Sequence, residues 1–382
     1  MADNSCLRVF VYGDIGGSGG YIRYCKGLFG SGAIPKEIEI IFVCSPSFYE
    51  QIKPLDDGIK IVHHSWSSSS SRLQRYLWHL AIYPALVRKI HPDVEFFPSG
   101  QLRVYLRKAV TVASCHNLLL FDQHELNRFT DKHQRRYFQT YRSHQESSYK
   151  RASGVIFFSE YSKRVVLGKV PELKITSVIP HGLEPHYCFL GSRTYDFGLQ
   201  VNLLYVSPIY PYKNHQEVIL AVKMLRKELD QDLRLRLVGG GSPEAVEKLK
   251  AFILKEEASE YINLVEFINT SELIEQYIKA DIFIFASSCE TFGITLLEAM
   301  AASLPIACSN RVGLPDILKD AGEYFDPEDP IAIANSLCKL ILSHELRKRL
   351  GEKAKRYSQE YTWKKAAQRT FSFIRQIAEQ QY

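Results

Sequence analysis

The amino-acid sequence predicts an α/β protein with two Rossmann-like domains, each built on a doubly wound parallel sheet. The chain has 382 residues, which is more than one hydrophobic core usually organises. Short β-branched apolar runs alternate with longer segments of helical periodicity along most of it. That alternation restarts after a stretch rich in Gly, Pro and polar residues at 175–200, and the restart predicts a second sheet.

The first sheet is predicted from short apolar runs in the N-terminal half. These runs are mostly apolar without a polar face, so we expect helices on both sides of each strand, as in a parallel sheet. The predicted strands are 7–13, 37–45, 59–64, 93–99, 109–116 and 153–160.

Further runs predict the second sheet, and helical segments such as 214–229 separate them. The predicted strands are 201–207, 233–241, 261–267, 280–288 and 304–310. We place the linker near 181–200 and the domains at 1–185 and 186–361. The final segment, 362–382, is predicted to be an amphipathic helix. It need not pack on the domain that precedes it; the alternative is an ordinary terminal helix on the second domain.

Composition excludes several classes of protein. No apolar run reaches the roughly 18 residues that a membrane span needs, and the N-terminus lacks the pattern of a signal peptide. The eight cysteines form no C-x-x-C pair, which favours free thiols in a reducing compartment and argues against structural zinc. The neighbouring His63 and His64 should point to opposite faces of a strand. We therefore expect a cytoplasmic protein without a bound metal.

Positive charge is concentrated in the N-terminal half. Residues 1–180 hold 24 Lys and Arg against 15 Asp and Glu, although the whole chain carries only +6. Much of this excess lies in 72–89 and 132–151, where basic residues stand beside aromatic ones. A solvated basic face explains this charge, and so does a surface for anionic lipid or an anionic acceptor. Nucleic acid is not expected, because no nucleic-acid-binding motif accompanies the charge.

A glycine-rich turn, "YGDIGGSGGYIRY" (12–24), follows the first predicted strand. Gly16, Gly17, Gly19 and Gly20 allow a ligand to approach the backbone closely, and the next helix points free N–H groups at an anion. The spacing differs from G-x-G-x-x-G, so a dinucleotide site has little support. A tight turn without a ligand is the alternative.

Two other candidate residues stand where ligands of parallel sheets bind, beyond the carboxyl ends of strands. Lys213 precedes Asn214, a predicted helix N-cap, and can meet a phosphate as a point charge. His116 ends the fifth predicted strand and can hydrogen-bond a substrate hydroxyl. An exposed lysine and a core histidine are the alternatives.

Two glutamates, Glu290 and Glu298, flank the start of a predicted helix in "SSCETFGITLLEAMAASLPIACSN" (287–310). The first amides of that helix can take a diphosphate, helped by the helix dipole. Carboxylates suit neutral sugars because each oxygen accepts hydroxyl hydrogen bonds. One glutamate can thus hold the sugar on the distal phosphate and the other the ribose of a nucleotide. Helix capping or a surface charge is the alternative for Glu298.

Taken together, these motifs resemble those of the family-4 retaining glycosyltransferases with the GT-B fold, most strongly over 201–330. "ETFGITLLEAMAASLPI" is similar to the E-x7-E motif of that family, and "VIPHGLEP" (178–185) resembles its interdomain linker. "YVSPIYPYKNH" resembles its phosphate-binding turn, and "GGYI" (19–22) its first glycine turn. His116 matches a histidine that lies near the donor sugar in the family.

The resemblance implies metal-independent, retaining transfer of a hexose from a GDP- or UDP-linked sugar to a glycan or lipid-linked acceptor, without a cofactor. It implies cell-surface polysaccharide synthesis, peripheral contact with an anionic membrane, an acceptor-binding N-terminal domain, a donor-binding second domain, and a final helix that crosses back. Lys213, Glu290 and His116 are implied as catalytic residues. Implied donor contacts are Gly19, Gly20, Ser207, Lys213, Gly239, Phe267, Phe292, Gly293, Ile294, Thr295, Leu296 and Glu298.

One departure from the family pattern is Pro208, which stands five residues before Lys213 where the family often has arginine. The phosphate site therefore lacks one positive charge. Lys213, helped by Tyr210 or Tyr212, would have to bind the phosphate without it. Two alternatives stay open: a nucleotide-sugar 2-epimerase of the same architecture, and a degenerate transferase that binds a nucleotide sugar without catalysis.

Overall fold

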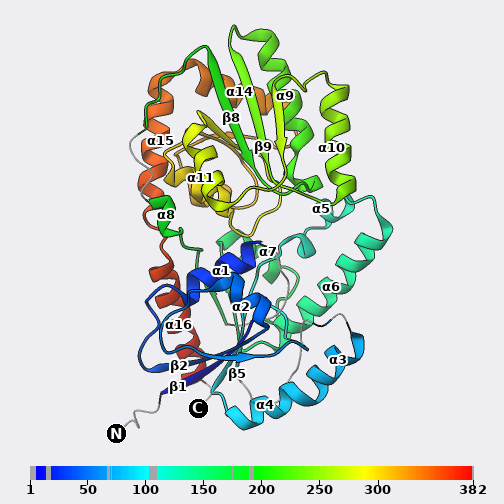
Figure 1. Cartoon of the computed structure of the whole chain (residues 1–382), viewed down its shortest axis with the longest axis vertical. Coiled ribbons are helices and arrows are strands. Elements are labelled where there is room, and N and C mark those ends of the chain that lie inside the picture. Colours follow the sequence, from blue (N-terminus) through cyan, green and yellow to red (C-terminus); the bar gives the residue numbers. More distant parts are fainter. Residues whose placement is uncertain are drawn as a thin grey trace. The chain divides into compact units, whose positions relative to one another are not determined.

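A computed structural model of the chain describes residues 6–13, 19–66, 69, 71–102, 110–173, 175–188 and 193–380. The chain forms two compact units, whose elements are labelled in Figure 1. Unit 1 comprises Met1–Phe121, His133–Gly182 and Thr362–Tyr382, and unit 2 comprises Asp122–Lys132 and Leu183–Tyr361. Each unit is described by itself.

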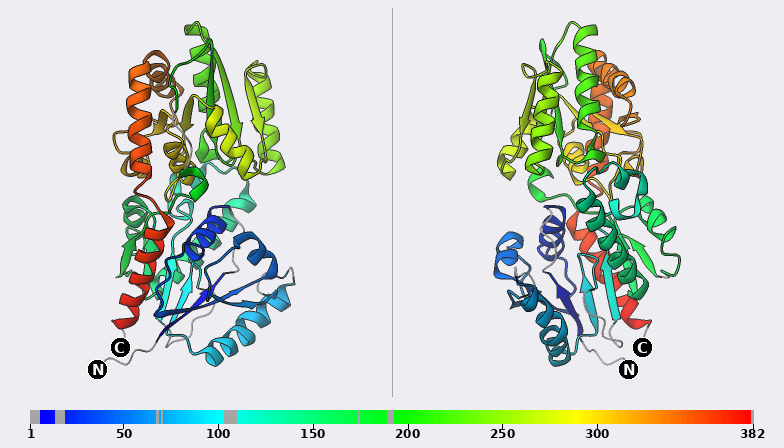
Figure 2. Two further views of the ribbon diagram at one scale, coloured as in Figure 1. Left: turned by 60° about the vertical axis from the view of Figure 1, so that its left-hand side comes forward. Right: turned by 90° about the vertical axis from the view of Figure 1, so that its right-hand side faces the viewer.

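Unit 1 is built on a seven-stranded parallel sheet of order β3-β2-β1-β4-β5-β6-β7. Its central strands are buried along their whole length, as expected for strands with helices on both faces (Figure 2). The strands are β1 (Leu7–Tyr12), β2 (Ile38–Cys44), β3 (Lys60–His63), β4 (Val94–Phe97), β5 (Val110–Ser114), β6 (Gly154–Phe157) and β7 (Thr176–Val178).

The helices of unit 1 include one stretch of π-helix and a short 3-10 turn. They are α1 (Gly19–Phe29), α2 (Pro46–Ile52), α3 (Arg72–Leu77), the π-helix η1 (Trp78–Ile82), α4 (Tyr83–Ile90), the 3-10 turn η2 (Leu119–Phe121), α6 (Lys132–Arg151), α7 (Glu160–Leu167) and α16 (Trp363–Glu379).

The C-terminal helix α16 belongs to unit 1, where it packs against α1 and β5. Its first residue, Trp363, lies so close to Gly27 of α1 that a Cβ at Gly27 would sit 2.0 Å from the indole ring. Phe373 and Ile377 cover the backbone of Gly154 in the same way. The helix buries one face, including Phe371 and Ile374, so the amphipathic pattern of 362–382 reflects core packing.

Unit 2 is built on a six-stranded parallel sheet of order β10-β9-β8-β11-β12-β13. The strands are β8 (Gln200–Val206), β9 (Asp232–Val238), β10 (Ile262–Val265), β11 (Ile282–Phe285), β12 (Ile306–Ser309) and β13 (Glu323–Phe325). The helices are α5 (Gln123–Asn127), α8 (Pro185–Cys188), the 3-10 turn η3 (Pro211–Lys213), α9 (His215–Glu228), α10 (Pro243–Lys255), α11 (Thr270–Lys279), α12 (Ile294–Ala301), α13 (Leu314–Leu318), α14 (Pro330–Leu342) and α15 (His344–Ser358).

Local sequence explains where several helices of unit 2 begin. Ser242 caps α10 by accepting from the amide of Ala245, and Pro243 fits the first helical position. Asn269 and Glu272 form a capping box at α11, in which each side chain accepts from the other's backbone N–H.

The structure differs from the expected organisation in three places. The short strands β7 and β13 extend the two sheets beyond the predicted strands, and β7 precedes the segment taken as the linker. The boundary between the units falls at Gly182 and Leu183 instead of after residue 185. Residues Asp122–Lys132 pack with unit 2, although they lie within the predicted N-terminal domain. The reason is Arg128, whose hydrogen bonds reach Asn214, Ser288 and Glu328 of that unit.

Two further expectations were free thiols and the lack of a membrane span. Seven cysteines have described side chains; these seven are free, and five of them are buried. Among the described residues, no helix is both long and apolar enough to cross a lipid bilayer.

Candidate active site

The side chains of Lys213 and Glu290 form a largely buried ion pair in unit 2. Lys213 ends the η3 turn that follows β8 and is only 6% exposed. Its Nζ donates a hydrogen bond to Oε1 of Glu290, whose side chain is 16% exposed. The same Nζ lies 5.3 Å from the ring centroid of Tyr212 and 5.7 Å from that of Phe285. Lys213 is therefore a desolvated positive charge with a fixed position. The alternative from the sequence, an exposed surface lysine, does not hold.

Two loops carry this pair, and hydrogen bonds join them. The amide of Ser288 donates to the carbonyl of Tyr212 at 2.9 Å, and Nδ2 of Asn214 donates to the carbonyl of Ala286 at 2.7 Å. Asn214 has φ 52° and ψ 40°, a left-handed conformation that asparagine tolerates better than most residues. It directly follows Lys213, so its side chain fixes the turn from which the lysine extends.

The helix α12 begins beside this pair. Its N-cap is Gly293 with φ 96°, and a Cβ there would lie 3.2 Å from the ring of Phe285, the ring that also faces Lys213. No side chain caps this helix. The amides of Ile294, Thr295 and Leu296 precede its first intrahelical bond, from Leu297 to Gly293. A positive lysine and a helix N-terminus thus share one region, as an anion site requires.

Glu298 lies inside α12 and is only 1% exposed. Its Oε2 accepts a hydrogen bond of 2.7 Å from the hydroxyl of Tyr277, which comes from α11. The carboxylate is thus neither a helix cap nor a surface charge. Its predicted contact with a ribose stays a prediction, and in such a contact the ribose hydroxyls would share the carboxylate with Tyr277.

Ser207 and Gly239 meet at the ends of β8 and β9. Gly239 has φ 140°, and a Cβ there would lie 2.1 Å from the carbonyl oxygen of Ser207. Ser207 Oγ lies 3.2 Å from Nε2 of His215, a buried imidazole whose pKa burial lowers to about 3. This close approach requires glycine at 239 whatever binds there.

Phe267 and Phe292 lie in contrasting surroundings. Phe267 follows β10, is 83% exposed, and covers the backbone of Gly240, where a Cβ would lie 2.4 Å from its ring. Phe292 is 2% exposed, and its ring packs edge-on against Tyr361 at 5.6 Å. An exposed ring suits stacking on a ligand, whereas the ring of Phe292 is part of the core.

The predicted residues of unit 1 lie at the carboxyl ends of its strands. Gly19 and Gly20 open α1, whereas Gly16 and Gly17 lie outside the described residues. His116 follows β5, and its ring packs edge-on between Tyr24 at 4.9 Å and Phe158 at 4.6 Å.

His116 carries a polar atom that the described residues leave unsatisfied. Its Nε2 is buried and has no hydrogen-bond partner among them. Burial lowers the pKa of this imidazole to about 3, and a hydrogen bond with the backbone of Pro98 opposes that shift. The ring is therefore neutral at physiological pH, so it can exchange a hydrogen bond with a ligand but cannot supply charge.

Arg128 is a site residue that the sequence analysis missed. Its Nη2 donates to Oδ1 of Asn214 at 2.7 Å, and its Nη1 lies 3.4 Å from Oγ of Ser288. It also pairs with Glu125 at 3.1 Å and Glu328 at 3.3 Å. No pattern in the sequence signals this residue, because Asn214 and Ser288 lie 86 and 160 residues away along the chain.

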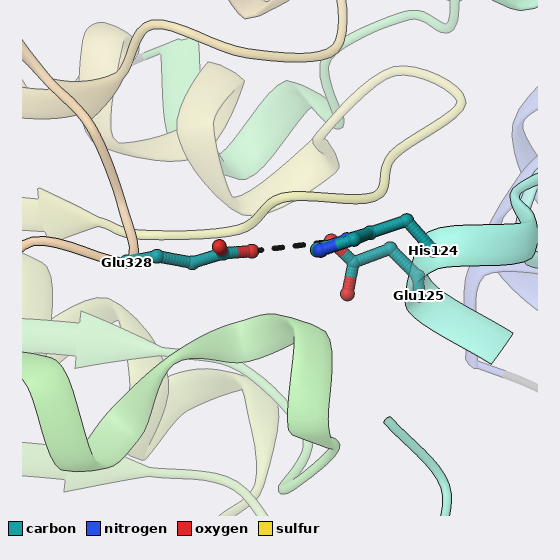
Figure 3. A group of neighbouring side chains, drawn as sticks. All are labelled: His124, Glu125 and Glu328. Carbon is teal, nitrogen blue, oxygen red and sulfur yellow. Dashed lines mark hydrogen bonds and ion pairs between the residues drawn. The ribbon is translucent and has the colours of Figure 1, made fainter. Parts of the chain in front are cut away.

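His124, Glu125 and Glu328 gather beside Arg128 (Figure 3), and their ligand atoms all lie within 4.8 Å of one another. Such a group could hold a metal ion. However, Arg128 pairs with both carboxylates, and Arg311, which also pairs with Asp326, contacts Glu328 at 3.0 Å, so arginines already occupy both carboxylates. This arrangement favours an ion-pair network over a metal site.

Comparison with known proteins shows what the chain is similar to. Residues 200–357, which carry Lys213, Glu290 and Glu298, match the family model of the glycosyl transferases group 1. Over 365 residues the chain is 23% identical to O-antigen chain mannosyltransferase B of Escherichia coli, covering 92% of this chain and 94% of that protein. HepE of Anabaena, solved in complex with UDP and glucose, superposes with a TM-score of 0.71 at 16% identity, over 98% of this chain and 99% of that one. The chain has the GT-B fold, and its residues 200–357 match the glycosyl transferases group 1.

A further relative matches the chain over a shorter range. The D-inositol 3-phosphate glycosyltransferase of Corynebacterium diphtheriae is 28% identical over 173 residues, which are 44% of this chain and 40% of that protein. The family match begins at residue 200, so it lies in the half of the chain that holds the Lys213–Glu290 pair.

Proposed function

We propose that this protein is a glycosyltransferase that moves a hexose, with retention of its anomeric configuration, from a nucleotide diphosphate sugar to a glycan or lipid-linked acceptor. The observation that carries the proposal is the buried pair of Lys213 and Glu290 beside the first turn of α12. A positive charge, a helix N-terminus and a carboxylate in one place suit a diphosphate that bears a sugar.

The chemistry follows from the charge that develops on the leaving group. As the bond from the anomeric carbon to the diphosphate oxygen breaks, Lys213 and the amides of 294–296 stabilise the new negative charge. These groups act without a metal ion. The arriving diphosphate competes for Lys213, and Glu290 then accepts hydrogen bonds from the hydroxyls of the donor sugar. In unit 1, the neutral His116 Nε2 is a buried atom that can exchange a hydrogen bond with a substrate hydroxyl.

Retention is assigned to attack on the same face of the sugar from which the diphosphate leaves. The acceptor oxygen bonds to the anomeric carbon, and a phosphate oxygen of the leaving group takes the acceptor proton. This route needs no protein nucleophile, so the charge on Glu290 stays available for the donor sugar.

Similar proteins support the substrate classes. HepE was solved with UDP and glucose, which supports a nucleoside diphosphate donor carrying a hexose. The name of the Escherichia coli relative supports a mannosyl donor and an O-antigen acceptor, and so a role in cell-surface polysaccharide synthesis. We therefore propose a UDP- or GDP-linked hexose as the donor.

The test is a donor screen that measures release of nucleoside diphosphate from UDP-glucose, UDP-galactose and GDP-mannose, with and without EDTA. We expect one donor to be hydrolysed slowly by the purified protein, at equal rates with EDTA, and Lys213→Ala to abolish that release. Proton NMR of the first-formed product with an acceptor should show the anomeric configuration of the donor. No release with any donor would favour the non-catalytic alternative, and release of a 2-epimerised sugar would favour the epimerase.

We also propose that unit 1 docks on the cytoplasmic face of a membrane containing anionic lipid. Leu73, Tyr76, Leu77 and Leu80 lie at helical spacing along α3 and η1, and three of them are more than 60% exposed. Exposed Arg72 precedes this apolar stripe. An apolar stripe beside basic residues suits the interface of a bilayer, where a lipid-linked acceptor is also found.

Flotation tests this docking with vesicles of phosphatidylcholine alone and with added phosphatidylglycerol. The protein should float only with the anionic vesicles, and Leu73→Ser/Leu80→Ser should stay at the bottom of the gradient. Leu254→Ser/Leu342→Ser is the matched control, because those leucines of unit 2 are 70% and 68% exposed. Equal recovery with both vesicle types, or unchanged flotation of the unit 1 variant, would overturn the proposal.

A further inference from the structure

Arg128 touches both loops that carry the Lys213–Glu290 pair. Its Nη2 donates to Asn214, the residue after Lys213, and its Nη1 reaches Oγ of Ser288, two residues before Glu290. We propose that Arg128 is a positioning residue that sets the geometry of this pair. The inference rests on the proposed function, because it deepens the account of the same site.

The two loops otherwise meet through few groups. Ser288 donates to the Tyr212 carbonyl from both its amide and its hydroxyl, and Asn214 donates to the Ala286 carbonyl. The guanidinium of Arg128 has only hydrogen-bond donors. It donates to Oδ1 of Asn214 and to Oγ of Ser288, the acceptor atoms of the two side chains that donate across the loops. Its guanidinium thus completes a cross-link in which Asn214 and Ser288 use both donor and acceptor atoms.

The charge of Arg128 argues against a direct role in binding the diphosphate. Glu125, which is 1% exposed, and Glu328 both pair with the guanidinium, so its positive charge is matched before any anion arrives. Arg128 therefore does not restore the charge that Pro208 removes. Its contribution lies in the direction of its N–H groups.

The planar guanidinium is what this position needs. Four acceptors surround Arg128, on α5, on the Lys213 turn, on the Glu290 loop and at Glu328. A lysine keeps the charge and can still pair with the two carboxylates, but its three N–H donors radiate from one nitrogen and cannot serve all four acceptors, which Arg128 reaches from Nη1 and Nη2. Arg128→Lys therefore separates the positioning role from the ion pairs that hold the segment 122–132.

The test compares Arg128→Lys with Arg226→Lys, a control arginine of the same unit whose side chain pairs with Asp232 and is 29% exposed against 23% for Arg128. The first readout is nucleoside diphosphate release. We expect Arg128→Lys to lower kcat by at least about tenfold while the KM of the donor changes by less than about threefold, because the donor still binds but the pair is misaligned. Arg226→Lys should match the wild type.

The second readout does not depend on activity. Acetylation of Lys213 by acetic anhydride, followed by mass spectrometry, reports how well the turn is held. We expect the rate at Lys213 to rise by at least about threefold in Arg128→Lys, because a loosened turn opens more often. Lys223, which pairs with Glu256 at 2.9 Å, serves as the internal reference.

These readouts separate the possible failures. Wild-type protein without activity would refute the proposed function, and the acetylation rates would then decide the role of Arg128 alone. A lower melting temperature with unchanged kcat and unchanged Lys213 acetylation would mean that Arg128 only fastens its own segment, and would overturn the inference. If Arg128→Lys does not fold, Ser288→Ala removes one acceptor of the cross-link and should raise Lys213 acetylation in the same way.

Discussion

Lys213 and Glu290 are 77 residues apart in the sequence, yet their side chains form an ion pair in which the lysine is only 6% exposed. Such a pair is costly to keep out of water, and removing one partner leaves an uncompensated charge. Two loops and the start of α12 meet at this point. In the proposed function this pair exchanges partners, and an incoming diphosphate takes the lysine.

Substitution of either member of the pair should abolish most of the activity without unfolding the protein. We expect Lys213→Ala and Glu290→Ala each to lower kcat by at least about tenfold, because each removes a group that stabilises or orients the reacting donor. Release of nucleoside diphosphate measures this, and Lys223→Ala, a lysine paired with Glu256 in the same unit, is the control. Near-wild-type rates for both variants would refute the assignment.

Gly239→Ala should destabilise unit 2. The new Cβ would lie 2.1 Å from the Ser207 carbonyl oxygen at a residue with φ 140°, so we expect a loss on the order of 2 kcal/mol in the free energy of unfolding. Urea titration measures it. Gly198→Ala is the matched control, because a Cβ at Gly198 meets nothing within 4 Å. Equal stability of the two variants would contradict the close approach of Ser207 and Gly239.

Tyr277→Phe should weaken the packing around Glu298. The substitution removes the 2.7 Å hydrogen bond to a carboxylate that is 1% exposed, and we expect a cost of about 1–3 kcal/mol in unfolding free energy. Tyr261→Phe in the same unit is the comparison, since its ring contacts the Arg226 guanidinium at 4.3 Å and that contact survives the change. Equal effects of the two substitutions would argue against a specific role for the Tyr277 hydroxyl.

Glu95 should make stability depend on pH. This residue of β4 is 1% exposed, and burial raises its pKa from the usual 4.5 to about 7, although a hydrogen bond from Tyr83 opposes the shift. Because the folded chain binds this proton more tightly, the stabilisation is complete below pH 4.5 and is lost as the pH rises through about 7.

The comparison for Glu95 is Glu95→Gln, which stays neutral at every pH. As the pH rises from 4.5 to about 7, the free energy of unfolding of the wild type should fall by about 3 kcal/mol relative to that of the variant, measured by urea unfolding. Parallel stability curves for the two proteins across this range would contradict the raised pKa.

Much of the fold follows from the sequence, because buried parallel strands such as β6 and β11 are runs without a polar side chain. The strands β7 and β13 escaped prediction for a physical reason. Each has three residues at the edge of its sheet, and β7 has none fully buried, so neither leaves an apolar signal.

The site was only partly predictable. Lys213 and Glu290 were found because each follows a strand in a recognisable turn. Arg128 was missed because its partners Asn214 and Ser288 lie 86 and 160 residues away, and no local pattern encodes such contacts. The burial of Glu298 depends on Tyr277, which lies on another helix, so only the tertiary structure reveals that hydrogen bond.

The central claim, that the Lys213–Glu290 pair and the start of α12 hold the diphosphate of a nucleotide sugar, is tested most directly by calorimetric titration of UDP and GDP. We expect one of these nucleotides to bind the wild type and Lys223→Ala equally, and to bind Lys213→Ala at least about tenfold more weakly, a difference of about 1.4 kcal/mol. Equal affinity of all three proteins for that nucleotide would contradict the account.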